Sequence, residues 1–173
     1  RGGGLVAGRG PEGAGRRGEG PGEPGTGEGP GKEGGVFYQR GLERQMGAAR
    51  GIIDAHAPDR VITFGGDCLV SQAPFAYLNE RYDGRLGLVW IDAHPDVTTP
   101  ADFDHAHAMA LGNLLGEGEP LMASEVALPL RPEQVALAGV DGVFGHEREA
   151  IDRFGLKVIP SAEISGGAVA DWI

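Results

Sequence analysis

The segment Asp92-Ala93-His94-Pro95-Asp96 places two carboxylates and an imidazole at alternate positions. In an extended segment, residues two apart project to the same side, so Asp92, His94 and Asp96 are expected to point into one small volume. Such a group is costly to desolvate without a cation. Two oxygen ligands and one nitrogen suit Mn²⁺, Zn²⁺ or Fe²⁺. The alternative is an ordinary turn in which Asp92 caps a helix.

A second candidate ligand, Cys68, follows Gly65-Gly66-Asp67. The glycines allow a close approach of the backbone, and Asp67 is expected to support the site by hydrogen bonding to its ligands. Cys68 is open to three interpretations: a metal ligand, a redox-sensitive thiol, or a small buried residue that fills space.

Two histidines, His105 and His107, follow in the same region. We expect His105 to lie on a surface loop. His107 stands at the entry to a predicted helix, where a histidine near a metal site can act as a proton donor or shuttle. His107 is therefore predicted to be catalytic. Asp92, in the candidate metal-binding segment, is predicted to be catalytic as well.

Both candidate segments follow predicted strands. Residues 60–64 form a β-branched run that ends at a glycine pair, and residues 86–91 are almost continuously apolar, as in a strand buried on both faces. Further strands are predicted at 134–140 and 156–160, and helices at 42–56, 69–82, 107–115, 146–154 and from 168 onward. This alternation predicts an α/β fold with an open, mostly parallel sheet and helices on both faces. Ligands bind beyond the carboxyl ends of such strands, so both segments are expected on one rim.

The bulk composition narrows the class of protein. Residues 1–35 are rich in Gly, Pro, Glu and Arg and are predicted to be a disordered or irregular leader, with one domain at 36–173. A net charge of -10 argues against broad nucleic-acid binding. No apolar stretch is long enough for a membrane span or a signal peptide. A single cysteine excludes an internal disulfide framework, and a cytoplasmic location is the default expectation.

These motifs, in this order, resemble those of the arginase/agmatinase/formimidoglutamase superfamily, the ureohydrolases. The family's Gly-Gly-Asp-His motif reads here Gly65-Gly66-Asp67-Cys68. Its Asp-Ala-His-x-Asp motif is intact at residues 92–96, and its His-Gly-Met landmark reads His107-Ala108-Met109. The resemblance covers residues 36–173 and implies a three-layer α/β/α sandwich around a mostly parallel sheet.

The resemblance also implies an activity: metal-dependent hydrolysis of a C–N bond in a linear amidine, with a small guanidino or amidino substrate and a binuclear manganese centre. Asp92 would bridge the metals, Asp96 and His94 would each bind one, and Cys68 would stand in place of a histidine ligand. Because a thiolate is soft, Cys68 makes Zn²⁺ an alternative to Mn²⁺. His107 would match the histidine proposed for proton transfer. Self-association is left open.

The chain departs from the family pattern in further ways. The last metal motif, Ser-x-Asp-x-Asp, is expected beyond the helix that begins near 168, so the C-terminal part of the fold, with two aspartate ligands, is expected to be missing. Phe144 lies near the position of an aspartate that contacts the substrate amine, and Thr98 replaces an asparagine. The alternative function is therefore a truncated, inactive arginase-like domain that binds metal or a partner. A nucleotide-binding domain is disfavoured, because the glycine spacing at Gly65 matches no phosphate-binding pattern.

Overall fold

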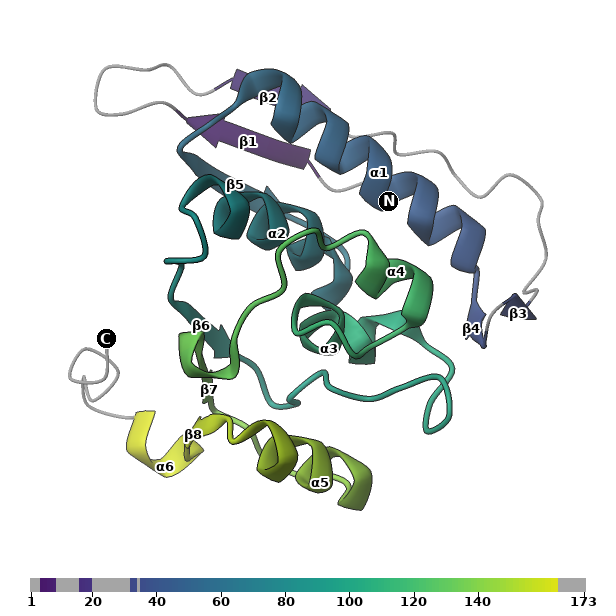
Figure 1. Ribbon diagram of the computed structural model, residues 1–173, viewed down its shortest axis with the longest axis vertical. Helices are drawn as coiled ribbons and strands as arrows, with labels where there is room; N and C mark the ends of the chain where they lie inside the picture. Colours follow the sequence, from purple (N-terminus) through teal and green to yellow (C-terminus); the bar gives the residue numbers. More distant parts are fainter. Residues whose placement is uncertain (1–3, 9–15, 20–31, 34, 165–173) are drawn as a thin grey trace.

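The computed structural model describes residues 4–8, 16–19, 32–33 and 35–164 (Figure 1). The described strands are β1 (Gly4–Gly8), β2 (Arg16–Glu19), β3 (Lys32–Glu33), β4 (Val36–Phe37), β5 (Arg60–Phe64), β6 (Leu88–Ile91), β7 (Val135–Ala138) and β8 (Lys157–Ile159). The described helices are α1 (Gln39–His56), α2 (Gln72–Arg81), α3 (Ala110–Leu114), α4 (Pro120–Ser124), α5 (Gly145–Phe154) and α6 (Ser161–Ile164), with 3-10 turns η1 (Cys68–Ser71), η2 (Ala106–Met109) and η3 (Pro132–Gln134). No helix among these residues has the length and apolar character that a membrane span requires.

A parallel sheet in the order β6-β7-β8 organises the later part of the described chain. Its registers pair Leu88 with Val135 and Ala138 with Ile159. These four side chains are buried, since apolar residues in a parallel sheet are covered by the helices that connect the strands. The predicted α/β alternation and the parallel sheet are confirmed for these strands.

β5 belongs to a different sheet from β6. It pairs antiparallel with β1, from Gly4 opposite Phe64 to Gly8 opposite Arg60, and no hydrogen-bonded pairing joins β5 to β6 within the described residues. Ile91 is 70% exposed. The expectation that residues 86–91 are buried on both faces is therefore wrong at Ile91, because no described element covers this end of β6.

Helix α1 packs on α2 through a small apolar cluster that includes Ile53 and Tyr77. The Tyr77 hydroxyl donates to the Pro58 carbonyl at 2.7 Å, which fixes the turn between α1 and β5. Ala57 ends α1 in the left-handed region with φ 43°, and Pro58 prevents the helix from continuing. The predicted helix at 42–56 is confirmed and begins slightly earlier, at Gln39.

A buried polar network ties the first four α-helices together. Glu119 caps α4 by accepting the Met122 N–H at 2.8 Å, and it also accepts from Gln39 Nε2 at 3.2 Å. Its own N–H donates to Asn113 Oδ1, and Asn113 Nδ2 donates to Gln72 Oε1. Glu119, Asn113, Gln72 and Gln39 are each at most 2% exposed. These bonds satisfy groups that would otherwise be costly to bury.

Strands β1, β2 and β3 fall within the leader. β1 pairs with β2 and β5, and β3 pairs with β4, through backbone hydrogen bonds that do not depend on apolar side chains. A disordered or irregular leader at residues 1–35 stays a prediction. For the other leader residues the prediction lies outside the described part of the chain. The helix predicted from 168 onward lies outside it as well.

Candidate metal centre

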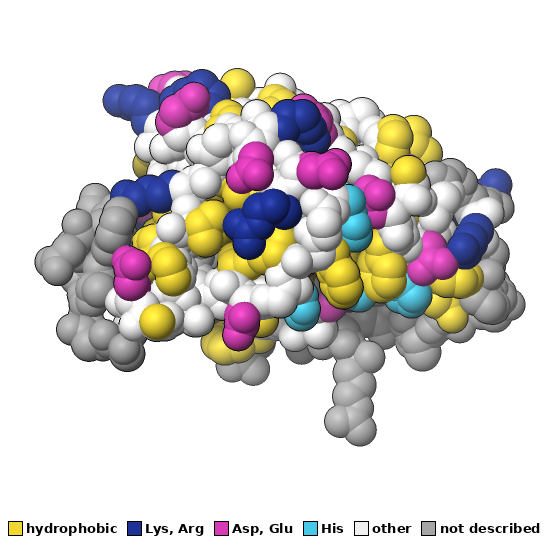
Figure 2. All heavy atoms as spheres, turned by 90° about the horizontal axis from the view of Figure 1, so that it is seen from below, with side chains coloured by type: hydrophobic (Ala, Val, Ile, Leu, Met, Phe, Trp, Pro, Cys, Tyr) yellow, Lys and Arg dark blue, Asp and Glu magenta, His cyan; other side chains and the backbone are white. Residues whose placement is uncertain are grey.

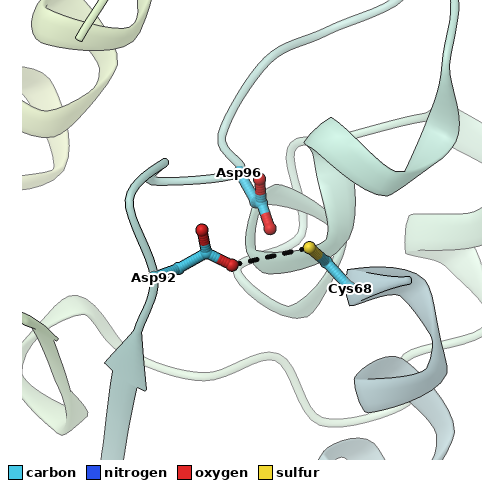
Figure 3. Close-up of side chains that lie close together, drawn as sticks. All are labelled: Cys68, Asp92 and Asp96. Atoms are coloured by element: carbon cyan, nitrogen blue, oxygen red, sulfur yellow. Dashed lines mark hydrogen bonds between the residues drawn. The ribbon is translucent and has the colours of Figure 1, made fainter. Parts of the chain in front are cut away.

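Cys68 lies beside Asp92 and Asp96, although it comes from a separate segment of the chain (Figure 3). The Cys68 thiol donates to Asp92 Oδ2 at 3.5 Å. One ligand atom from each of these residues lies within 4.8 Å of the other two. A sulfur and two carboxylates at this spacing are a donor set that could hold a divalent cation.

Cys68 is positioned by the turn that follows β5. It begins η1, and the Asp67 carboxylate caps this turn by accepting the Leu69 N–H at 3.0 Å. Gly65 is required by packing, because a Cβ there would come within 2.7 Å of Val70 Cβ. The prediction of a close backbone approach thus applies to Gly65. Asp67 acts on the turn that carries Cys68, and no bond from it to Asp92 or Asp96 is seen in this described region.

Asp92 is held at the end of β6. Its N–H donates to the Ala138 carbonyl of β7 at 3.1 Å, a bond that closes the last parallel pair, Ile91 with Ala138. Its Oδ1 accepts the His94 N–H at 3.0 Å, while Oδ2 faces Cys68. The carboxylate therefore stabilises the bend that follows the strand and still presents one oxygen to the site.

Asp96 is the buried member of the group, with 2% exposure. Its backbone has φ 50°, a left-handed conformation that aspartate tolerates better than most residues. The Gly112 N–H donates to its carbonyl at 2.9 Å and holds this conformation. Its Oδ2 atom is buried and has no hydrogen-bond partner. An unpaired buried carboxylate oxygen is costly, and a bound cation would satisfy it.

Burial raises the pKa of Asp96 to about 7. Repulsion from Asp92 and from Glu147 adds to the rise, whereas the Cys68 thiol and His94 oppose it. Burial, together with hydrogen bonding and repulsion involving the two aspartates, raises the pKa of Cys68 to about 12. Both shifts arise because negative charge accumulates in a desolvated volume. A divalent cation placed there would offset the negative charge that raises both pKa values.

His94 does not join the three gathered side chains. Its side chain is 60% exposed, and Nδ1 lies 3.8 Å from Asp92 Oδ1. The expectation of three side chains projecting to one side assumed an extended segment. Residues 92–94 instead form a bend, and Asp96 is left-handed, so the alternation of an extended strand is lost. The structure therefore brings together Asp92, Asp96 and Cys68, with His94 at the edge.

His107 lies in a cluster of rings beside the site. Its ring centroid is 6.1 Å from that of Phe103 and 6.0 Å from that of His105. Its turn, η2, packs on η1, the turn that carries Cys68. His105 is exposed and bonded to Asp104 at 2.7 Å, as expected of a loop residue. Seen from below, the surface of the molecule has histidine side chains next to hydrophobic ones (Figure 2).

Three further residues, Thr98, Phe144 and Glu147, differ in their burial and in their hydrogen bonds. Thr98 is buried, and its hydroxyl donates to the Ala108 carbonyl at 2.9 Å, so it ties the loop to η2. Phe144 is 62% exposed at the start of α5. Glu147 is 2% exposed and accepts the Phe144 N–H at 2.9 Å. Glu147 was not singled out from the sequence, although a glutamate three residues after a helix start is a signal for a capping interaction.

The fold and the site define an α/β protein with a candidate divalent-metal centre at the carboxyl end of a parallel strand. The chain belongs to the arginase family, whose family model matches residues 35–173. The resemblance drawn from the sequence motifs is therefore confirmed.

The alignments with individual relatives cover only part of each relative's length. The arginase of Bacillus caldovelox is 31% identical over 107 residues, which are 60% of this chain and 36% of that relative. The arginase of Eremothecium gossypii is 32% identical over 107 residues, which are 59% of this chain and 27% of that relative. The aligned part of this chain thus spans about a third of the length of these curated relatives.

Solved arginases share the fold. The Entamoeba histolytica arginase in complex with L-ornithine superposes with a TM-score of 0.73 at 22% identity, covering 86% of this chain and 53% of that one. A Bacillus subtilis arginase superposes with a TM-score of 0.60 at 27% identity, covering 77% of this chain and 47% of that one. The predicted arginase-like α/β fold is confirmed, and the chain spans about half the length of these structures.

Proposed function

We propose that this chain carries the metal-binding part of a hydrolase that acts on a C–N bond of a small guanidino or amidino compound. The observation that carries the proposal is the convergence of Cys68, Asp92 and Asp96 around a buried, unpaired oxygen of Asp96. Membership of the arginase family supports a hydrolase of the arginase type. The donor set fits a divalent cation, since it joins hard carboxylate oxygens to a thiol in a desolvated volume.

Divalent cations at such sites lower the pKa of water and orient it beside an electrophilic carbon. In this proposal Asp92 and Asp96 hold the cation, and Cys68 lies close enough to be a third ligand. His94 is proposed to turn inward and complete the set when a cation binds; its Nδ1 lies 3.8 Å from Asp92 Oδ1, which supports this proposal. Mn²⁺, as a binuclear centre, is the metal that the family resemblance implies.

His107 is proposed to donate a proton to the nitrogen that leaves as the C–N bond breaks. Two features support this role: η2 packs against the turn that carries Cys68, and the His107 ring is only partly buried. The neighbouring Phe103 ring restricts where the imidazole can go. An imidazole can both donate and accept a proton, and a partly exposed one can exchange its proton with solvent after each turnover.

The proposed substrate is a guanidine without the α-amino acid group of arginine. Phe144 presents an exposed aromatic ring where the sequence comparison expected an acidic contact to an amine. Thr98 uses its hydroxyl within the loop. We propose a cytoplasmic setting for the protein, in which its single cysteine stays reduced, with self-association left open and no nucleic-acid partner.

The test is release of urea by the purified chain loaded with Mn²⁺ or Zn²⁺, with arginine and with alkyl guanidines as substrates. The expected result is metal-dependent urea release that is larger for the alkyl guanidines and is lost in an Asp92→Asn, Asp96→Asn double variant. Release that is unchanged in the double variant would contradict the proposed site.

A second candidate function is a catalytically inactive domain that binds metal or a partner. It is favoured by Cys68 at a ligand position and by the exposed apolar side chains of β5 and β6. Stoichiometric metal binding without urea release from any of the guanidines would favour this function over the hydrolase.

A further inference from the structure

The gathered donors are chemically mixed: one sulfur from Cys68 and one carboxylate each from Asp92 and Asp96. Thiolate sulfur favours zinc-like cations, whereas carboxylate, carbonyl and water oxygens suit Mn²⁺. We infer that Cys68 is a direct ligand at this site and shifts its selectivity from Mn²⁺ toward Zn²⁺. This inference rests on the proposed function in one respect, since it requires that the site bind a cation.

A second observation points to a ligand at the same place. Asp96 is only 2% exposed, and its Oδ2 atom has no hydrogen-bond partner. The Asp96 carboxylate is turned toward Cys68 and Asp92 (Figure 3). An acidic surface cluster would leave such an oxygen in water. Here the oxygen is buried beside a thiol, and a cation is the partner that this arrangement lacks.

Space filling alone does not account for the position of Cys68. Its side chain packs in part against the apolar core, but it is also partly exposed, and its sulfur donates to a carboxylate. A thiol is a weak donor, so this contact alone gives little reason for sulfur at this position. The turn that carries it is held by the Asp67 cap and by the buried Leu69 side chain. The sulfur is therefore held against the two carboxylates.

Zinc also suits the number of ligands present. Zinc sites that act on a substrate usually have three protein ligands and one open position. Cys68, Asp92 and Asp96 supply three, and the exposed edge by His94 leaves room for a fourth. On coordination the thiol proton passes to solvent and the sulfur binds as thiolate. The sequence contains no other cysteine that could compete for a disulfide.

The experiment is a Co²⁺ titration of the full chain followed by ultraviolet and visible absorption, then displacement by Zn²⁺ or Mn²⁺. Cobalt bound to thiolate sulfur gives a charge-transfer band in the near ultraviolet, whereas cobalt bound only to oxygen and nitrogen gives its visible bands alone. Cys68→Ser removes the soft donor at nearly constant size. Cys68→His restores a ligand without sulfur. Asp83→Asn, an exposed left-handed position away from the site, is the matched control.

The wild type and Asp83→Asn are expected to show the charge-transfer band, and both Cys68 variants are expected to lack it. Nitrogen, oxygen and sulfur sites in general bind Zn²⁺ more tightly than Mn²⁺, so the decisive quantity is the change in that preference. Cys68→Ser should weaken Zn²⁺ binding by on the order of a hundredfold, which is the upper end of the range for changes to residues that only support a ligand, with a much smaller effect on Mn²⁺. Cys68→His should move the preference toward Mn²⁺.

Two results would overturn the inference, and they differ in their consequence for the proposed function. Visible cobalt bands without a charge-transfer band would show a metal site in which Cys68 is not a ligand, and the proposed function would stand. No cobalt spectrum in a chain that unfolds cooperatively on heating would overturn both. Cooperative unfolding of the Cys68 variants shows that a lost band reflects a lost ligand and not a lost fold.

Discussion

The Cys68 sulfur lies 3.5 Å from Asp92 Oδ2, although the two residues follow strands that belong to different sheets. The contact is made by the turns beyond β5 and β6, where a glycine turn carries the thiol and a bend carries the carboxylate. Side chains from separate parts of the chain thus meet where parallel α/β proteins bind their ligands. This relationship makes the region a candidate site and gives the following tests their common target.

Binding of Zn²⁺ is expected to stabilise the folded chain. A ligand that binds only the native state adds about 2.7 kcal/mol at a free concentration of 100 times its Kd. Differential scanning fluorimetry with increasing Zn²⁺ should therefore show a rising Tm in the wild type. The rise should disappear in the Asp92→Asn, Asp96→Asn double variant. An equal rise in both proteins would place the stabilising metal elsewhere.

The metal-free chain is expected to lose stability as the pH rises from about 4 to about 7. Asp96 has a folded-state pKa of about 7 against 3.8 for the ordinary group, so folding favours its protonated form. The resulting contribution is fully present below pH 3.8 and is lost as the pH passes through about 7. Its size is on the order of 2 to 4 kcal/mol.

Asp96→Asn should remove this part of the pH dependence. Asparagine resembles the protonated carboxyl and also tolerates the left-handed backbone at this position. Urea unfolding at several pH values should show a flatter profile for the variant and a more stable variant at pH 8. A variant profile parallel to that of the wild type would contradict the assigned role of Asp96.

His107→Asn is expected to lower kcat while leaving the metal content unchanged. Loss of a general acid typically costs about 10²- to 10⁴-fold in rate, and His107 is not among the gathered donors. His105→Asn is the control, because this neighbouring ring is exposed and bonded to Asp104. Urea release and elemental analysis should be measured on both. Equal losses in the two variants would argue for a structural role of the ring cluster.

Glu119→Ala should destabilise the fold by roughly 2 to 3 kcal/mol, because it removes the α4 cap, leaves the buried Met122 N–H unsatisfied and takes one of its two acceptors from Gln39 Nε2. Leu121→Ala, at a position of 54% exposure on the same helix, should change stability by less than about 0.5 kcal/mol. Urea denaturation measures both. A small effect at Glu119 would mean that α4 contributes little to the stability of the described fold.

The exposed apolar positions on β5 and β6 are expected to promote self-association. Phe64 is 68% exposed and Ile91 70%, and strands with unpaired, apolar edges are templates for pairing with other chains. Phe64→Lys and Ile91→Lys together should lower the concentration-dependent light scattering of the chain. Leu121→Lys removes a comparable exposed side chain from a helix and should change it little. Light scattering that falls equally in the double variant and in Leu121→Lys would mean that self-association depends on exposed apolar area in general and not on these strands.

The sequence predicted the parts of the fold that depend on local pattern. The helix α1 and the strand β5 were located because apolar spacing and β-branched residues set them directly. The short helix α4 was missed, since five residues are too few for a periodic pattern to emerge. The pairing of β1 with β5 was also missed, because it depends on backbone hydrogen bonds between distant segments.

The roles assigned to the candidate site residues stay predictions, and the structure bears on how close together these residues lie. Asp92, Asp96 and Cys68 do meet, but the expectation that both segments lie on one rim of a single sheet is wrong, because β5 pairs with β1 outside the β6-β7-β8 sheet. The orientation of His94 could not be read from spacing, because the left-handed conformation of Asp96 is held by a bond from Gly112, which is distant in sequence. The burial of Asp96, which raises its pKa, likewise depends on packing that no local pattern reveals.

The most direct test is elemental analysis of the purified chain after equilibration with Mn²⁺ and Zn²⁺ and removal of free metal, beside the Asp92→Asn, Asp96→Asn double variant and the Asp83→Asn control. The proposed site predicts near-stoichiometric metal in the wild type and the control, and little in the double variant. Metal content that is the same in all three, or absent from the wild type, would contradict a metal centre at Cys68, Asp92 and Asp96.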